Sequence, residues 1–263
     1  MWKDLSGSRN AGTVWSGAME RGSLQTRLNN QATMPDGISL KVRLIRRTVW
    51  GLIILPVVLF LSAGTTDYWQ GWAFLAASFI PPLGLTAYFY RHDPQLLERR
   101  LLRKENVKAQ KIIMLLMKLL YLVALILPGL DYRFGWSRVF CGPVPWWLTL
   151  LALLVMVACN VLFFLVLKAN RFAASVVQVE AEQTVSDAGL YRFFRHPMYL
   201  GGLVLWIALP LALGSYLALP LAVLGIPLLI LRLLNEEKLL HRELSGYAEY
   251  CRRVRYRLIP LVW

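Results

Sequence analysis

Two charged stretches decide the fold of this chain: Tyr191-Arg192-Phe193-Phe194-Arg195-His196-Pro197-Met198-Tyr199-Leu200-Gly201 and Arg232-Leu233-Leu234-Asn235-Glu236-Glu237. Between them run two apolar segments, Leu203 to Leu213 and Leu217 to Leu231, separated by Gly214-Ser215. Gly and Ser are turn residues, so the segments predict two helices folded back on each other as a hairpin. The hairpin returns both charged stretches to one face of a membrane, where polar side chains can be assembled at the lipid boundary.

Long apolar runs dominate the rest of the 263-residue chain, which is 57% hydrophobic. Four runs precede the hairpin: Val49 to Ala63, Trp72 to Tyr90, Ile112 to Leu130 and Trp146 to Leu167. The sequence therefore predicts an all-α integral membrane protein with about six transmembrane helices, the last two forming the C-terminal hairpin. A helix from Met198 to Leu213 is only about 24 Å long against a hydrocarbon core of about 30 Å. Whether the hairpin crosses the whole bilayer is left open.

The formal net charge of +14 could indicate a nucleic-acid partner, so the positions of the 29 Lys and Arg residues matter. All except Arg133 and Arg138 lie on one side of the predicted spans: 8 in residues 1–47, 8 in 91–118, 4 in 168–196 and 7 in 232–257. By the positive-inside rule these segments and both termini are cytoplasmic. Topology and attraction to anionic headgroups explain the charge, so we expect membrane lipids and no nucleic acid as partners.

The chain divides by composition into an extension and a membrane region. Residues 1–40 are rich in Ser, Gly, Asn, Thr and Arg without sustained apolar periodicity, so a disordered N-terminal extension is predicted. Residues 41–167 are expected to form a four-helix membrane region, with a helix near residues 94–110 lying in the headgroup plane. The cysteines, Cys141, Cys159 and Cys251, have no metal-ligand spacing, and no metal site is expected.

His196 and Pro197 begin the first helix of the predicted hairpin. Proline fits the first turn of a helix because its missing N–H costs nothing there. His196 and the neighbouring backbone donors then lie at a helix N-terminus, which favours an anionic ligand group. A structural interpretation stays open, in which Arg192 and Arg195 anchor the chain at the membrane surface and Pro197 merely starts the helix.

Glu236 and Glu237 are adjacent carboxylates at the end of the last apolar helix, and they can bind a cation. Arg232 stands four residues before Glu236, so an intrahelical ion pair is the structural alternative. The hairpin brings Glu236 back near His196 and Tyr199. A cluster that offers both a carboxylate and a helix N-terminus suits a zwitterionic cofactor.

From about Asn170 onward the chain resembles the isoprenylcysteine carboxyl methyltransferase family, whose wider relatives include membrane phospholipid methyltransferases and small-thiol methyltransferases. The resemblance rests on Asn170-Arg171-Phe172, Val176-Val177-Gln178, Gln183-Thr184-Val185-Ser186, Gly189-Leu190-Tyr191, Arg195 to Gly201, Arg232 with Glu236-Glu237, Tyr247-Ala248-Glu249-Tyr250 and Arg253-Val254. It covers roughly the last third of the chain. The tail from Arg253 to Pro260 resembles bacterial members more than eukaryotic prenylcysteine enzymes, which implies a bacterial inner-membrane protein.

This resemblance implies S-adenosylmethionine as the cofactor, bound on the cytoplasmic side by a methyltransferase region over residues 168–263. Carried over residue by residue, the family's cofactor contacts fall on Gln178, Gln183, Thr184, Val185, Ser186, Tyr191, His196, Pro197, Met198, Tyr199 and Glu236. Arg232 would position the methyl acceptor. The acceptor implied is lipophilic or small and carries a carboxylate, thiol or amine.

Two other functions fit the same residues. Sterol-type reductases use NADPH and share the histidine-proline and paired-acid arrangement, and the tail from Arg253 to Pro260 also resembles theirs, although they are usually longer. A non-catalytic carrier or scaffold, in which the charged cluster only fixes topology, is compatible with six spans.

Overall fold

The computed structural model describes residues 39–102, 108–172, 183–260 and 262–263. Helices make up 79% of the described residues, and these contain no strand. The chain is therefore the all-α integral membrane protein that its apolar runs predict. The expected N-terminal extension lies almost entirely outside the described residues.

Two compact units divide the chain, Met1–Ile53 and Ile54–Trp263, and the boundary lies within helix α2 (Leu40–Ala63). In the first unit, Ser39 caps the start of α2: its carbonyl accepts from the Arg43 N–H at 3.2 Å and its hydroxyl from the Val42 N–H at 3.4 Å. Serine is a preferred residue at this position because its oxygen satisfies an otherwise unpaired donor.

The second unit contains the end of α2 and the remaining helices. In chain order these are α3 (Trp69–His92), α4 (Pro94–Leu102), α5 (Lys108–Phe134), α6 (Trp136–Phe140), α7 (Trp146–Ala169), the 3₁₀ helix η1 (Gly189–Arg192), α8 (Pro197–Ala212), α9 (Leu219–Glu243) and α10 (Tyr247–Arg253). Five of the described helices, α2, α3, α5, α7 and α9, are long and apolar enough to cross a membrane. The sixth apolar helix is α8, which has only 16 residues.

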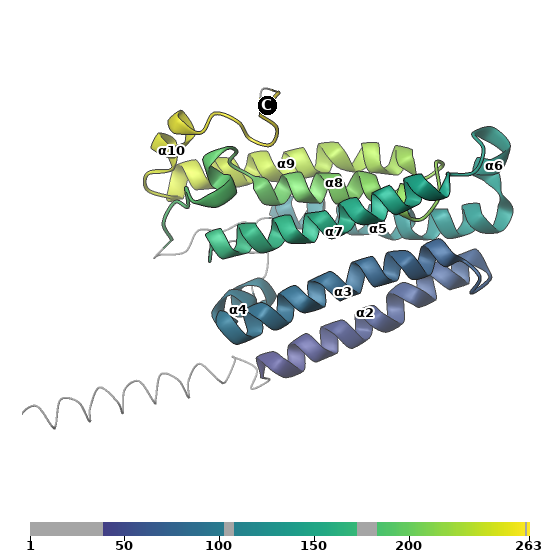
Figure 1. Cartoon of the computed structure of the whole chain (residues 1–263). Helices are drawn as coiled ribbons and strands as arrows, with labels where there is room; N and C mark the ends of the chain where they lie inside the picture. Colours follow the sequence, from purple (N-terminus) through teal and green to yellow (C-terminus); the bar gives the residue numbers. More distant parts are fainter. Residues whose placement is uncertain (1–38, 103–107, 173–182, 261) are drawn as a thin grey trace, which may run out of the picture. The chain divides into compact units, whose positions relative to one another are not determined.

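Helix α7 packs against α8 and α3, and α9 packs against α8 and α5. Figure 1 shows α7, α8 and α9 lying side by side, with the start of α8, the end of α9 and α10 at the same end of the unit. The close approach of α7 and α8 depends on Gly201, because a Cβ atom there would lie 2.7 Å from Cε1 of Phe163. The hairpin of α8 and α9 thus brings the two charged stretches to one end, as predicted.

The turn between α8 and α9 lies at the other end and is held by Asp131 at the end of α5. This carboxylate is only 3% exposed. It accepts the Ser137 N–H at 2.6 Å and the hydroxyls of Ser137 and Ser215. Gly214 supplies the positive φ of +71° that the turn requires. These contacts fix where the hairpin reverses and so which residues of α8 and α9 face each other.

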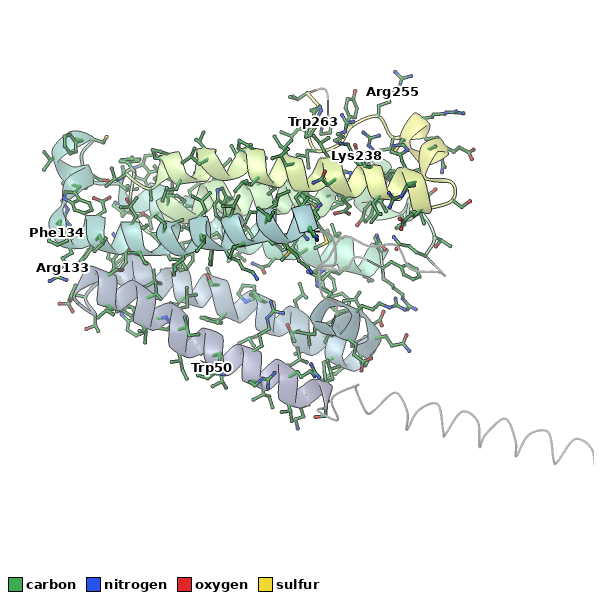
Figure 2. All side chains as sticks on the ribbon, turned by 180° about the vertical axis from the view of Figure 1, so that it is seen from behind. Trp50, Arg133, Phe134, Lys238, Arg255 and Trp263 are labelled. Carbon is green, nitrogen blue, oxygen red and sulfur yellow. The ribbon has the colours of Figure 1, made fainter. Side chains whose placement is uncertain are left out.

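Charged side chains lie at both ends of the second unit. Figure 2 shows Arg133 and Phe134 at one end and Lys238 and Arg255 toward the other. The helix expected near residues 94–110 is observed as α4, which ends at Leu102. It begins after Asp93, whose Oδ1 accepts the Leu96 N–H at 3.3 Å. Leu96 and Leu97 are buried, and α4 packs against α3.

Candidate functional site

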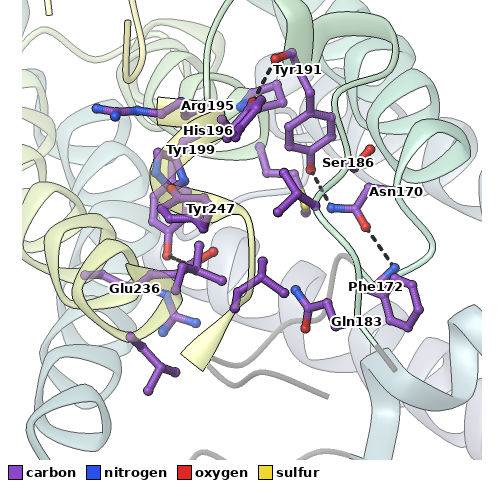
Figure 3. A pocket seen from close by; sticks show the side chains of 18 of the residues that line it. Asn170, Phe172, Gln183, Ser186, Tyr191, Arg195, His196, Tyr199, Glu236 and Tyr247 are labelled. Carbon is purple, nitrogen blue, oxygen red and sulfur yellow. Dashed lines mark hydrogen bonds between the residues drawn. The ribbon is translucent and has the colours of Figure 1, made fainter. Parts of the chain in front are cut away.

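A cavity of about 350 Å³ lies where the start of α8, the end of α9, α10 and the segment before η1 meet. Figure 3 shows Tyr191, Ser186 and Asn170 on one side of it, with His196, Tyr199 and Glu236 on the other. Its size falls within the range of about 300–1,000 Å³ that is usual for small-molecule sites. The cavity is therefore large enough for one small ligand.

The structure brings nearly all of the predicted site residues to this cavity. Its walls include ten of the predicted cofactor contacts and Arg232: Gln183, Thr184, Val185, Ser186, Tyr191, His196, Pro197, Met198, Tyr199 and Glu236. Gln178 lies outside the described residues.

Glu236 presents its carboxylate to the cavity beside Tyr199. The Tyr199 hydroxyl donates to Oε2 of Glu236 at 2.5 Å, which joins the end of α9 to the first turn of α8. Arg232, one turn earlier on α9, also lines the cavity and hydrogen-bonds to Tyr199. A carboxylate held in place by a tyrosine is a suitable partner for an ammonium group.

Glu237 has a different set of partners, all of them cationic or able to become so. Its Oε1 lies 3.1 Å from Nη2 of Arg195 and 3.3 Å from Nε2 of His196, and its Oε2 lies 2.7 Å from Nε of Arg257. The side chains of Arg195, His196 and Glu237 are 8%, 4% and 6% exposed. The acid beside His196 is therefore Glu237, whereas the sequence suggested Glu236. Adjacent helical residues point about 100° apart, so the two acids serve different neighbours.

The start of α8 is occupied in part by the chain's own backbone. The Arg195 N–H donates to the Tyr256 carbonyl at 2.9 Å, and the His196 N–H donates to the Arg257 carbonyl at 3.0 Å. These two backbone donors therefore face the C-terminal segment. An anionic ligand group near Pro197 therefore cannot use these two donors.

The opposite wall is a network of polar groups centred on Tyr191. Asn170 Nδ2 donates to the Tyr191 hydroxyl at 3.2 Å, and the Tyr250 hydroxyl donates to the Tyr191 carbonyl at 2.7 Å. The Ser186 hydroxyl donates to the carbonyl of Ala169 at 3.0 Å, which ties the segment before η1 to the end of α7. Burial raises the pKa of the Tyr191 phenol to about 12, so this side chain is neutral at physiological pH.

Two buried donors in the walls have no hydrogen-bond partner among the described residues: Nε of Arg195 and the hydroxyl of Tyr247. Burial also raises the pKa of Tyr247, which keeps its hydroxyl protonated and able to donate. An unsatisfied buried polar group costs about 1–3 kcal/mol, so such groups call for a partner. Both are donors, and the complementary ligand group is an acceptor such as a carboxylate.

Several wall residues were not among the predicted contacts. Asn170 and Tyr247 belong to motifs that carried the family resemblance, so a signal for them existed. Arg195 belongs to the same motif as His196, but the sequence leaves open that it only anchors the chain at the membrane surface. For Met117, Gly202 and Leu229 no sequence signal exists, because their place in the cavity depends on how α5, α8 and α9 pack.

Comparison with protein families supports the resemblance. Residues 146–245, from the start of α7 to just beyond α9, match the family model described as phospholipid methyltransferase. Comparison with curated proteins found no match. The matched residues include both sides of the cavity, from Asn170 and Tyr191 to His196 and Glu236. Residues 146–245 are therefore similar to the phospholipid methyltransferase family, which includes isoprenylcysteine and phospholipid methyltransferases.

Proposed function

We propose that this membrane protein is an S-adenosylmethionine-dependent methyltransferase and that the cavity at the start of α8 binds the cofactor. The observation that carries the proposal is that the family match and the cavity fall on the same part of the chain. Most residues that line the cavity lie within the part of the chain that matches the methyltransferase family, among them Glu236, Arg195 and the neutral Tyr191.

The described residues fit the polar groups of this cofactor. Glu236 is positioned to accept hydrogen bonds from its ammonium group, and the unpaired donors of Arg195 and Tyr247 suit its carboxylate. Asn170 and Tyr191 offer polar atoms to the nucleoside, and the ring of Phe172 offers an apolar face. A cavity of about 350 Å³ favours this cofactor over NADPH, which has nearly twice as many non-hydrogen atoms.

S-adenosylmethionine supplies an electrophilic methyl group, so the protein's main task is alignment of the acceptor with that group. Holding two reactants in the right geometry can lower the barrier by several kcal/mol, roughly 7–11 in the best cases. In our proposal Glu236 and Tyr199 fix one end of the donor. Arg232 binds and orients an anionic acceptor through its guanidinium, which matches a carboxylate in shape and charge. A carboxylate acceptor needs no general base, whereas an amine or thiol must first lose a proton.

The acceptor we propose is lipophilic. Beyond the polar groups, the cavity is lined by Met117 of α5, Gly202 of α8 and Leu229 of α9, three helices that pack within the membrane region. An apolar chain can lie against these residues while its polar head meets Arg232. Sideways access from the bilayer between the helices would then let a membrane lipid or lipid-linked acid reach the methyl donor.

We further propose that this end of the protein faces the cytoplasm of a bacterial cell, with the protein in the inner membrane. The proposal rests on the Lys and Arg distribution along the sequence, in which 27 of 29 basic residues belong to segments on one side of the predicted spans. Both termini would then be cytoplasmic. Residues 168–263 would form the cofactor-binding region, and α7 supplies the helix against which α8 packs.

The test is to incubate membranes containing the protein with S-adenosylmethionine labelled in its methyl group, and to measure label in the organic extract, in protein and in volatile thioethers. We expect label in the organic extract, and its loss in the Arg232→Gln variant. The reductase alternative is separated by thermal unfolding of the purified protein. S-adenosylhomocysteine should raise the unfolding midpoint and NADPH should not, and the opposite result would overturn the proposal.

A further inference from the structure

The C-terminal segment from Tyr256 to Trp263 lies outside the matched methyltransferase residues, yet it contacts the start of α8 directly. We infer that Arg257 in this segment is a positioning residue for the cofactor site. It acts through Glu237, which in turn holds Arg195 and His196 in the cavity wall. This inference rests on the proposed function, because it assigns Arg257 a role in binding the same cofactor.

Arg257 and the cavity share one carboxylate. Glu237 receives Nε of Arg257 at 2.7 Å on Oε2, while its Oε1 lies 3.1 Å from Nη2 of Arg195 and 3.3 Å from Nε2 of His196. Arg195 and His196 line the cavity, and Arg257 is not among the described residues that do. An effect of the Arg257 side chain on a ligand therefore passes through Glu237.

Arg257 is itself fixed from the other side. Its N–H donates to the main-chain oxygen of Trp263 at 2.9 Å, and the Leu258 N–H donates to the same oxygen at 3.1 Å. The guanidinium carbon of Arg257 lies 5.1 Å from the centre of the Trp263 ring, within the range of a cation–π contact. The segment thus folds back on itself and presents the guanidinium to Glu237 in a defined position.

The backbone of this segment contacts the same two residues that Glu237 holds. The Arg195 N–H donates to the Tyr256 carbonyl at 2.9 Å and the His196 N–H to the Arg257 carbonyl at 3.0 Å. Arg195 and His196 are therefore held twice, once by the backbone of the C-terminal segment and once by Glu237. Loss of the Arg257 side chain loosens only the second of these restraints, so its contribution can be measured while the backbone contacts remain.

Without the guanidinium of Arg257, Oε2 of Glu237 loses its closest partner. The carboxylate of Glu237 is then free to turn. Arg195 and His196 then lose the fixed acceptor that orients them. Glu236, the preceding residue on α9, lines the cavity, and the contacts of Glu237 help to fix the rotation of that helix. A change at Arg257 should thus weaken cofactor binding while the fold persists, since Arg257 is one-third exposed.

The experiment measures the dissociation constant of S-adenosylhomocysteine by calorimetry on the full chain in detergent, for wild type, Arg257→Gln, Arg257→Lys and the control Arg255→Gln. Arg255 is exposed and lies two residues away in the same segment. We expect Arg257→Gln to bind about 10-fold more weakly, the equivalent of about 1.4 kcal/mol. Arg257→Lys should recover part of the affinity, and Arg255→Gln should match wild type. Thermal unfolding of each variant checks that the protein is folded at the assay temperature.

Equal affinity of Arg257→Gln and wild type would overturn the inference, and so would an equal loss in Arg257→Gln and Arg255→Gln. A loss confined to samples that are already unfolding at the assay temperature would also overturn it. If wild type itself does not bind S-adenosylhomocysteine, the proposed function fails instead.

Discussion

The adjacent acids Glu236 and Glu237 give the most informative perturbation, because the structure assigns them different tasks. Glu237→Gln removes the negative charge that lies against Arg195 and His196, whose side chains are 8% and 4% exposed. An arginine side chain in a protein cannot lose its proton and become neutral. One uncompensated buried charge costs about 3–5 kcal/mol. At about 2–4 °C per kcal/mol for a chain of this size, the midpoint of thermal unfolding should fall by roughly 10 °C.

Glu236→Gln is the matched control for that substitution. Its side chain is only partly buried, and a glutamine oxygen can still accept the hydrogen bond of Tyr199. Its unfolding midpoint should stay close to wild type, whereas its affinity for S-adenosylhomocysteine should fall because the ammonium loses its carboxylate. Both variants are measured by intrinsic tryptophan fluorescence during heating in detergent, without ligand. A Glu237→Gln midpoint within about 2 °C of wild type would refute the reasoning about the buried cluster.

Three further predictions follow from the packing and the burial of the described residues. Gly201→Ala should destabilise the protein by about 1–3 kcal/mol because its Cβ would lie 2.7 Å from Phe163. Gly202→Ala, whose Cβ would meet Leu229 at 3.7 Å, should be neutral in the same unfolding assay, and equal effects of the two would contradict the α7–α8 contact. Tyr247→Phe should leave the ligand-free protein at least as stable as wild type, because it removes a buried hydroxyl that has no partner there, but should weaken S-adenosylhomocysteine binding in calorimetry. Burial raises the pKa of Tyr191 to about 12, so the unfolded chain loses this proton first and stability falls as pH rises from about 10 to 12. Tyr191→Phe should flatten that part of the stability–pH curve, and an unchanged slope would contradict the burial of the phenol.

Much of the fold can be read from the sequence because each membrane helix is a local pattern. The run after Pro197 and the turn at Gly214-Ser215 predict a hairpin, and the structure has α8 and α9 there. The positions of the basic residues along the sequence predict that the charged stretches before α8 and at the end of α9 lie on one side of the membrane. Helix ends are harder to place: the apolar run from Trp72 to Tyr90 predicts a helix whose observed bounds are those of α3, Trp69–His92.

The composition of the site was predictable only in part. His196, Tyr199 and Glu236 carry a motif and are close together in sequence or across one hairpin, so their meeting could be expected. Which acid contacts His196 could not, because Glu236 and Glu237 differ by about 100° on the helix and packing alone sets its rotation. The contribution of Arg257 depends on a C-terminal segment folding back onto α8, a contact between residues far apart in sequence. No local pattern encodes such a contact.

The central claim is that the cavity at the start of α8 holds S-adenosylmethionine, with Glu236 bound to its ammonium group. An experimental structure of the full chain with S-adenosylhomocysteine tests this most directly. We expect the ligand to lie between Tyr191 and Tyr199, with its amine within about 3.2 Å of the Glu236 carboxylate. The carboxylate of the ligand should lie near Arg195 and Tyr247. A ligand bound elsewhere on the protein, or bound here with its amine away from Glu236, would contradict it.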